Sequence, residues 1–220
     1  MEGKGRIKVK KDGPYVVTGG VPLVKMVVVP DSDGRPLAWR EVSRYPAREA
    51  YSLCRCGGSK IKPFCDGAHA KNGFDGTETA TREPYLNNVK EFKGPELTLL
   101  DNKPLCIGAG FCDRAGGIWN LAVRSDDPEY KEITIEEAAN CPSGRLVLLD
   151  KEGKLIEPPY EPSIVVVEDA EGYEGPLWVR GGVEIESCDG HVYETRNRVS
   201  LCQCGKSENK PLCDGSHFDE

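Results

Sequence analysis

The sequence contains SLCRCGGSKIKPFCDGAH at residues 52–69 and SLCQCGKSENKPLCDGSH at residues 200–217. The two segments align without gaps and are identical at 12 of 18 positions. Upstream of them, GPYVVTGGVPL at residues 13–23 matches GPLWVRGGVEI at residues 175–185 at 6 of 11 positions. Self-similarity of this kind indicates a duplicated structural unit. Each repeat is therefore larger than its cysteine motif.

Both copies present three cysteines and one histidine at the same spacing: C-x-C, eight residues, a cysteine, three residues and a histidine. Four such donors within a short loop can wrap a metal centre, whereas the two cysteines of C-x-C are badly placed to form a disulfide with each other. We therefore predict a metal site in each copy, with ligands Cys54, Cys56, Cys65 and His69 in the first and Cys202, Cys204, Cys213 and His217 in the second. Two Cys3His zinc sites would use the same residue types, although paired zinc cysteines are usually further apart.

The residues between the ligands are expected to shape each loop. Proline fixes φ, glycine permits a sharp bend, and aspartate can cap the first turn of a short helix that carries the histidine. Serine is expected to donate a hydrogen bond toward thiolate or sulfide. These positions are Ser59, Pro63, Asp66 and Gly67 in the first copy and Ser207, Pro211, Asp214 and Gly215 in the second.

The composition favours small domains with short strands. The 220 residues are 38% hydrophobic and include 25 glycines, 16 prolines and 10 cysteines. Because small domains bury little apolar surface, they commonly add metal sites as staples. The start, residues 1–12, lacks the apolar core of a signal peptide, and no stretch approaches the length that spans a bilayer. We therefore expect a cytoplasmic protein with reduced cysteines and no membrane partner.

The formal net charge of −7 makes general attraction to nucleic acid unexpected and suits a basic docking partner. The start is a basic exception, with Lys4, Arg6, Lys8, Lys10 and Lys11. We interpret these residues as a solvated strand edge.

The segments around the loops have the pattern of hairpins. We predict strands at residues 24–29, 38–42 and 192–196, with tight turns at Asp33-Gly34 and Asp189-Gly190. The turn at 189–190 also accounts for Cys188 and His191, which echo the end of the motif without its earlier cysteines. Three units are expected: a first repeat at 1–82, a middle unit at 97–150 and a second repeat at 163–220.

In the middle unit we predict strands at 97–100 and 146–149 and a short helix at 134–140, with Thr134 and Glu137 as a capping box. The fold class is α+β, made mainly of short strands. The cysteines here, Cys106, Cys112 and the Cys141-Pro142 pair, partly follow the run of a bacterial ferredoxin, with Ala109 where a second cysteine would stand.

The loop pattern Cys-x-Cys-x2-Ser-x3-Pro-x-Cys-Asp-Gly-(Ala/Ser)-His resembles that of the CDGSH iron–sulfur domain family, and the chain is similar to its tandem members. The resemblance implies a [2Fe-2S] cluster in each copy, with one iron held by the two C-x-C cysteines and the other by the third cysteine and the histidine. It implies that the repeats pack as a pseudo-dimer, in a monomer or a homodimer. The middle unit is similar to the divergent single-cluster ferredoxin-like domains joined to such motifs. Its three cysteines would hold a [3Fe-4S] cluster, or the fold would be cluster-free with buried or paired thiols.

Three functions follow from these residues. The first is one-electron transfer with a redox-protein partner, at potentials between those of all-cysteine and two-histidine clusters. The second is storage of clusters and delivery to an apo-protein, or pH and redox sensing, because imidazole can be protonated. The third is a zinc-stapled interaction module. Because His191 is the only histidine left outside the ligand sets, a Cys-His or Ser-His nucleophilic system has little to draw on, so we expect no enzyme.

Overall fold

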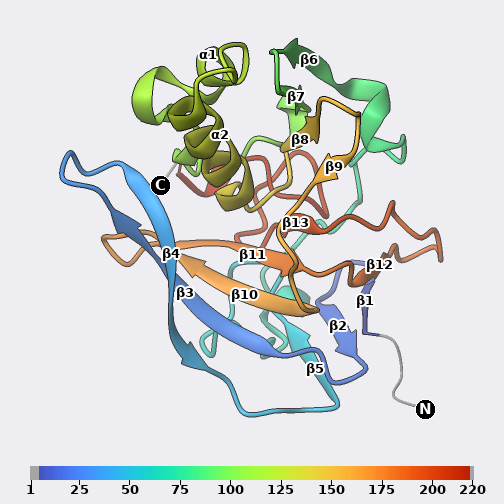
Figure 1. Ribbon diagram of the computed structural model, residues 1–220. Helices are drawn as coiled ribbons and strands as arrows, with labels where there is room; N and C mark the ends of the chain where they lie inside the picture. The colour runs from blue at the N-terminus through green and yellow to red at the C-terminus, as the bar shows by residue number, and fades with distance from the viewer. Residues whose placement is uncertain (1–4, 219–220) are drawn as a thin grey trace.

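The computed structural model describes residues 5–218, and in them most regular structure is β (Figure 1). The basic residue Lys4 lies outside the described part. Two sheets belong to the repeats, and a third belongs to the middle unit. The first, in spatial order, contains β12 (Glu184–Glu186), β1 (Arg6–Val9), β2 (Tyr15–Thr18) and β5 (Ala50–Leu53). The second contains β13 (Arg198–Leu201), β11 (Glu174–Arg180), β10 (Ser163–Glu168), β3 (Leu23–Pro30) and β4 (Pro36–Arg44).

The repeats exchange a strand. β12 comes from the second repeat but pairs in parallel with β1 of the first, while β3 of the first pairs in parallel with β10 of the second. A Gly-Gly pair precedes each exchanged strand, and all four glycines have φ between 64° and 80°. Two successive residues at positive φ redirect the chain in a way that other residues adopt only with strain. Gly19-Gly20 and Gly181-Gly182 thus send the next strand to the opposite sheet.

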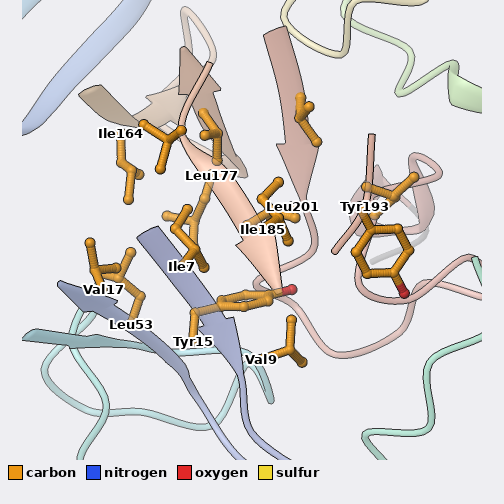
Figure 2. Packing of buried hydrophobic residues seen from close by; sticks show 14 of the residues in the cluster. Ile7, Val9, Tyr15, Val17, Leu53, Ile164, Leu177, Ile185, Tyr193 and Leu201 are labelled. Atoms are coloured by element: carbon orange, nitrogen blue, oxygen red, sulfur yellow. The ribbon is translucent and has the colours of Figure 1, made fainter. Parts of the chain in front are cut away.

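The main core lies between the two repeat sheets. Strands β1, β2 and β5 alternate buried and more exposed residues, so each turns one face inward. Figure 2 shows side chains of the first sheet, among them Ile7, Tyr15 and Leu53, facing Leu177 and Leu201 of the second. Both sheets therefore depend on the same apolar layer.

The other face of the second sheet supports the middle unit. Strand β10 is buried along almost its whole length, and Val165 and Val167 pack with Trp178 on the side away from the main core. Trp39 of β4 adjoins this group, lies 4.8 Å from the Phe111 ring between centroids, and donates through Nε1 to the Asn140 carbonyl. Aromatic packing thus ties the repeats to the middle unit.

The middle unit has a four-stranded antiparallel sheet with two α-helices. The sheet contains β6 (Lys90–Lys93), β7 (Leu97–Asp101), β8 (Leu146–Asp150) and β9 (Leu155–Ile156), which confirms the strands expected at 97–100 and 146–149. The helices are α1 (Ile118–Ala122) and α2 (Pro128–Asn140). Short 3-10 helices lie at η1 (Ala68–Ala70), η2 (Tyr85–Asn88), η3 (Lys103–Leu105), η4 (Phe111–Gly116) and η5 (Ser216–Phe218).

The predicted capping box was wrong. Helix α2 begins at Pro128, and the Asp127 side chain accepts hydrogen bonds from the backbone amides of Glu129 and Tyr130. Aspartate before a first-turn proline is a strong start signal, so the helix begins a turn and a half earlier than expected. Thr134 lies inside the helix and donates to the Tyr130 carbonyl.

The hairpin predictions were partly right. The turn at Asp33-Gly34 joins the antiparallel strands β3 and β4 as expected. The turn at Asp189-Gly190 also forms, but only one bridge, Glu186 to Val192, follows it, so the strand predicted at 192–196 was wrong. Polar side chains of that segment bond to the rest of the chain instead: Glu194 accepts from the Tyr85 amide. No helix within residues 5–218 is long and apolar enough to cross a membrane.

Candidate metal centres

Each cysteine loop is a strand that turns back on itself. Strand β5 leads into Cys54, whose amide donates to the Pro63 carbonyl at 2.7 Å, and the Cys65 amide donates back to Ser52 at 2.9 Å. The second loop makes the same two bonds from Cys202 and Cys213. Lys62–Pro63 and Lys210–Pro211 are both cis peptides. This return brings the third cysteine beside the first in both repeats.

The aspartates of the motif shape the histidine end, as expected. Asp66 accepts from the Ala68 amide through Oδ1 and from the Lys60 amide through Oδ2, at 3.0 and 2.9 Å. Asp214 makes the equivalent bonds to Ser216 and Glu208, at 3.0 and 2.7 Å. Gly67 and Gly215 follow at φ of 86° and 94° and start the short helices η1 and η5 that carry the histidines.

The serine prediction was wrong. The Ser59 hydroxyl donates to the Phe64 carbonyl at 2.6 Å and the Ser207 hydroxyl donates to Leu212 at 2.7 Å, so both stabilise the loop and neither donates to sulfur. Backbone amides take that role instead. Gly205 donates to Cys202 Sγ at 3.3 Å, Lys206 to Cys204 Sγ at 3.5 Å and Gly67 to Cys65 Sγ at 3.4 Å.

The eight predicted ligands form four pairs. In the first loop, Cys54 Sγ lies 4.0 Å from Cys56 Sγ, and Cys65 Sγ lies 3.4 Å from His69 Nδ1. In the second, Cys202 Sγ lies 3.6 Å from Cys204 Sγ, and Cys213 Sγ lies 3.5 Å from His217 Nδ1. The grouping is the same in both repeats: two sulfurs, then one sulfur with one ring nitrogen.

These separations fit two ligands on one tetrahedral metal. With metal–sulfur and metal–nitrogen bonds of about 2.3 and 2.0 Å, two tetrahedral ligands lie about 3.5–3.8 Å apart. Both pairs in each loop are close to this value. Within residues 5–218, no three His, Cys, Asp or Glu side chains surround a point that one metal ion could occupy. Two pairs per loop suit a centre with two metals, each taking two protein ligands.

Burial disfavours thiolates here unless a cation compensates. Burial raises the pKa of Cys213 to about 12 and is the largest cause of the raised pKa of Cys54. The pKa of Cys202 is raised by its hydrogen bond with Cys204 and by burial, and the same hydrogen bond lowers the pKa of Cys204 to about 6. A metal that binds sulfur would offset the cost of holding three thiolates together where one or two of them are buried.

The loops meet each other directly. A Cβ added at Gly57 would overlap the Cys204 carbonyl oxygen, and one added at Gly205 would lie 2.9 Å from the Cys56 carbonyl oxygen. Only glycine permits so close an approach of two backbones. The cysteine of one C-x-C motif therefore lies against the glycine that follows the other.

Tyr15 is a supporting residue that the sequence analysis missed. Its ring is fully buried, and its hydroxyl donates to the carbonyls of Cys202 at 2.7 Å and Pro211 at 3.0 Å. A strand of the first repeat thus holds the loop of the second. The only sequence signal was an asymmetry of the alignment, in which Leu177 stands opposite Tyr15.

The structure brings the three middle cysteines to one cavity. Cys106 follows η3, Cys112 lies in η4, Cys141 follows α2, and all three line a cavity of about 180 Å³. Burial, with the charges of Asp113 and Cys141, raises the pKa of Cys112 to about 12. Ala109 lies on the same wall and offers no ligand.

The remaining cysteine has no place in a site. Cys188 is exposed in the Ser187–His191 turn, where its amide donates to Glu78 Oε1 at 2.8 Å. This agrees with the turn predicted from the sequence. None of the ten cysteines, all of which lie within residues 5–218, forms a disulfide.

The chain matches two family models. The iron-binding zinc finger of CDGSH type matches at residues 12–70 and again at 174–218, and the divergent 4Fe-4S mono-cluster family matches at 92–151. No curated protein and no solved structure matches the chain significantly. The motifs, the paired donors and these matches agree. The chain is a tandem CDGSH iron–sulfur protein with a divergent single-cluster ferredoxin-like domain between its two CDGSH domains.

Proposed function

We propose that the chain carries single electrons on two [2Fe-2S] clusters, one in each CDGSH loop. The observation that supports this most strongly is the pairing of the donors. In each loop the C-x-C cysteines would hold one iron, and the third cysteine with the histidine would hold the other. When bound, such a cluster takes up and returns one electron, and a neutral imidazole in place of a thiolate raises its potential.

We propose that the repeats pack as an internal pseudo-dimer. The mutual exchange of β3 and β12 and the reciprocal contacts of Gly57 and Gly205 support this arrangement. In both features, each repeat does to the other what the other does to it. A single chain would then hold its two clusters side by side without a second copy.

We propose that the middle unit holds a third cluster through Cys106, Cys112 and Cys141. Their common cavity supports the site. The matching family is named for a four-iron cluster, but three thiolates suit a [3Fe-4S] centre, and Ala109 stands where a further cysteine would be.

The chain would act in the cytoplasm as an electron carrier for a redox-protein partner, and not as an enzyme. Delivery of clusters to an apo-protein uses the same ligands and is the competing function. The test compares wild type with His217→Cys, using His69→Cys as the matched variant of the other repeat. Each is assayed for electron uptake from a chemical reductant and for cluster transfer to an apo-ferredoxin.

Electron transfer predicts a lowered potential in both variants, because thiolate replaces neutral imidazole, and reversible one-electron cycling without loss of iron. Transfer of clusters from the wild type on the timescale of reduction, abolished in the cysteine variants, would refute the carrier function in favour of delivery.

A further inference from the structure

The histidine end of the second CDGSH loop contacts the cysteine loop of the middle unit. A Cβ added at Gly215 would lie 3.4 Å from the backbone of Ile107, which follows Cys106. One added at Gly108 would lie 3.0 Å from the Phe218 ring, and that ring packs on the His217 ring with 4.2 Å between centroids. Phe218 therefore lies between a predicted cluster ligand and the loop that joins Cys106 to Cys112.

The first CDGSH loop lacks this contact. Its residue after the histidine is Ala70 in place of phenylalanine. At Gly67, the counterpart of Gly215, no atom of the described residues lies within 4 Å of an added Cβ. Cys65 is also only partly buried, whereas its counterpart Cys213 is buried. The third cysteine is thus less buried in the first loop than in the second, whereas His69 and His217 are both partly buried.

The second loop contacts both other ligand sets. Through Cys204 and Gly205 it lies against Cys56 and Gly57 of the first loop, and through Gly215 and Phe218 it lies against the middle loop. Energetic coupling between sites is carried by chains of packed side chains and rigid elements. The backbone contacts therefore connect the three ligand sets in series, with the second loop at the centre.

We propose that electrons pass between the middle unit and the first CDGSH loop by way of the second. Phe218 is the residue that positions the contact between the second loop and the middle unit. This inference rests on the proposed function. In each step one centre is oxidised by one electron as its neighbour is reduced by one, and no proton or group moves with it. The first loop, whose third cysteine is less buried than that of the second, is the end that exchanges electrons with a partner.

The test uses the full chain, loaded with iron and sulfide and assayed without oxygen. A pulse of radiolytically generated reductant supplies less than one electron per chain, and freeze-quench EPR follows how that electron redistributes among the centres. Phe218→Ala removes the contact between the second loop and the middle unit, and Phe218→Tyr keeps the ring. Tyr173→Ala removes an exposed aromatic ring from the β10–β11 turn and is the matched control.

Phe218→Ala is expected to slow exchange between the middle centre and the CDGSH centres, while exchange between the two CDGSH centres keeps its rate. Phe218→Tyr and Tyr173→Ala should both behave as wild type. If electron exchange is unchanged in fully loaded Phe218→Ala, the proposed order of the three centres is refuted and the proposed function stays intact. A wild-type chain without a middle centre by iron analysis would refute the third cluster and the series together.

Discussion

Replacing Gly57 by alanine should separate the two CDGSH loops. Gly57 has φ of 74°, and its added Cβ would overlap the Cys204 carbonyl oxygen, with the Cys204 carbonyl carbon 3.0 Å away. The matched variant is Gly73→Ala, at φ of 70° with nothing within 4 Å of the added Cβ. Both variants carry the strain of a left-handed alanine, and only Gly57→Ala adds a clash with backbone.

The expected magnitudes follow from these two effects. A left-handed alanine costs roughly 1–2 kcal/mol, which is the whole effect expected at Gly73. Overpacking against a fixed neighbour adds roughly 1–3 kcal/mol, so Gly57→Ala should lower the free energy of unfolding by about 2–5 kcal/mol. The neighbour is backbone and cannot rotate away.

The assay is urea unfolding of the loaded protein, followed without oxygen by far-UV circular dichroism, together with the rate at which visible absorbance is lost. Gly57→Ala should unfold at lower urea than Gly73→Ala and lose its colour faster. If the two variants unfold together, the loops do not meet as described, and the series of contacts through the second loop fails with that result.

Three further changes test other parts of the structure. Tyr15→Phe removes the buried hydroxyl that donates to two carbonyls of the second loop, so it should cost about 1–3 kcal/mol and speed iron loss from that loop alone, measured by EPR of the two centres. Arg198→Met leaves the Glu157 carboxylate without its buried partner, so urea unfolding should show a loss of about 3–5 kcal/mol; an unchanged midpoint would contradict the role of this ion pair. Burial raises the pKa of Glu137 to about 7 despite Arg114 at 3.7 Å, so this carboxyl binds more protons folded than unfolded between about pH 4.5 and pH 7, and wild-type stability falls as pH rises through that range. Glu137→Gln should remove this fall and be more stable than wild type by about 1–3 kcal/mol near pH 8, and an equal pH dependence of the two proteins in urea unfolding would rule out the buried carboxyl as its source.

The cysteine loops were predictable because their geometry is local. The positions of Asp66, Gly67 and their counterparts follow from bonds made within a few residues, so the spacing of the motif carries them. The serines were misassigned at the same range because a hydroxyl can donate to any nearby acceptor. The returning strand brings the Phe64 and Leu212 carbonyls close, and the serine hydroxyls donate to these carbonyls instead of to sulfur.

The arrangement of the repeats could not be predicted from the sequence. A Gly-Gly pair indicates a redirected chain, but pattern alone does not say which sheet the next strand joins, since β3 and β12 would satisfy the same periodicity in either. The contact of Phe218 with Gly108 joins residues 110 positions apart and leaves no periodic signal. The start of α2 was predictable from Asp127 and Pro128 but was missed because a weaker Thr-Glu pattern lay further along the chain.

The most direct test of the paired-ligand account is the content of iron, acid-labile sulfide and zinc in protein purified without oxygen, with Mössbauer spectra of the iron. Two paired centres predict about four irons per chain with as many sulfides, rising to about seven irons if the middle site is filled, and two iron environments in each CDGSH centre, one with two sulfur ligands from protein and one with sulfur and nitrogen. A colourless protein with two zinc ions and no sulfide would contradict the account.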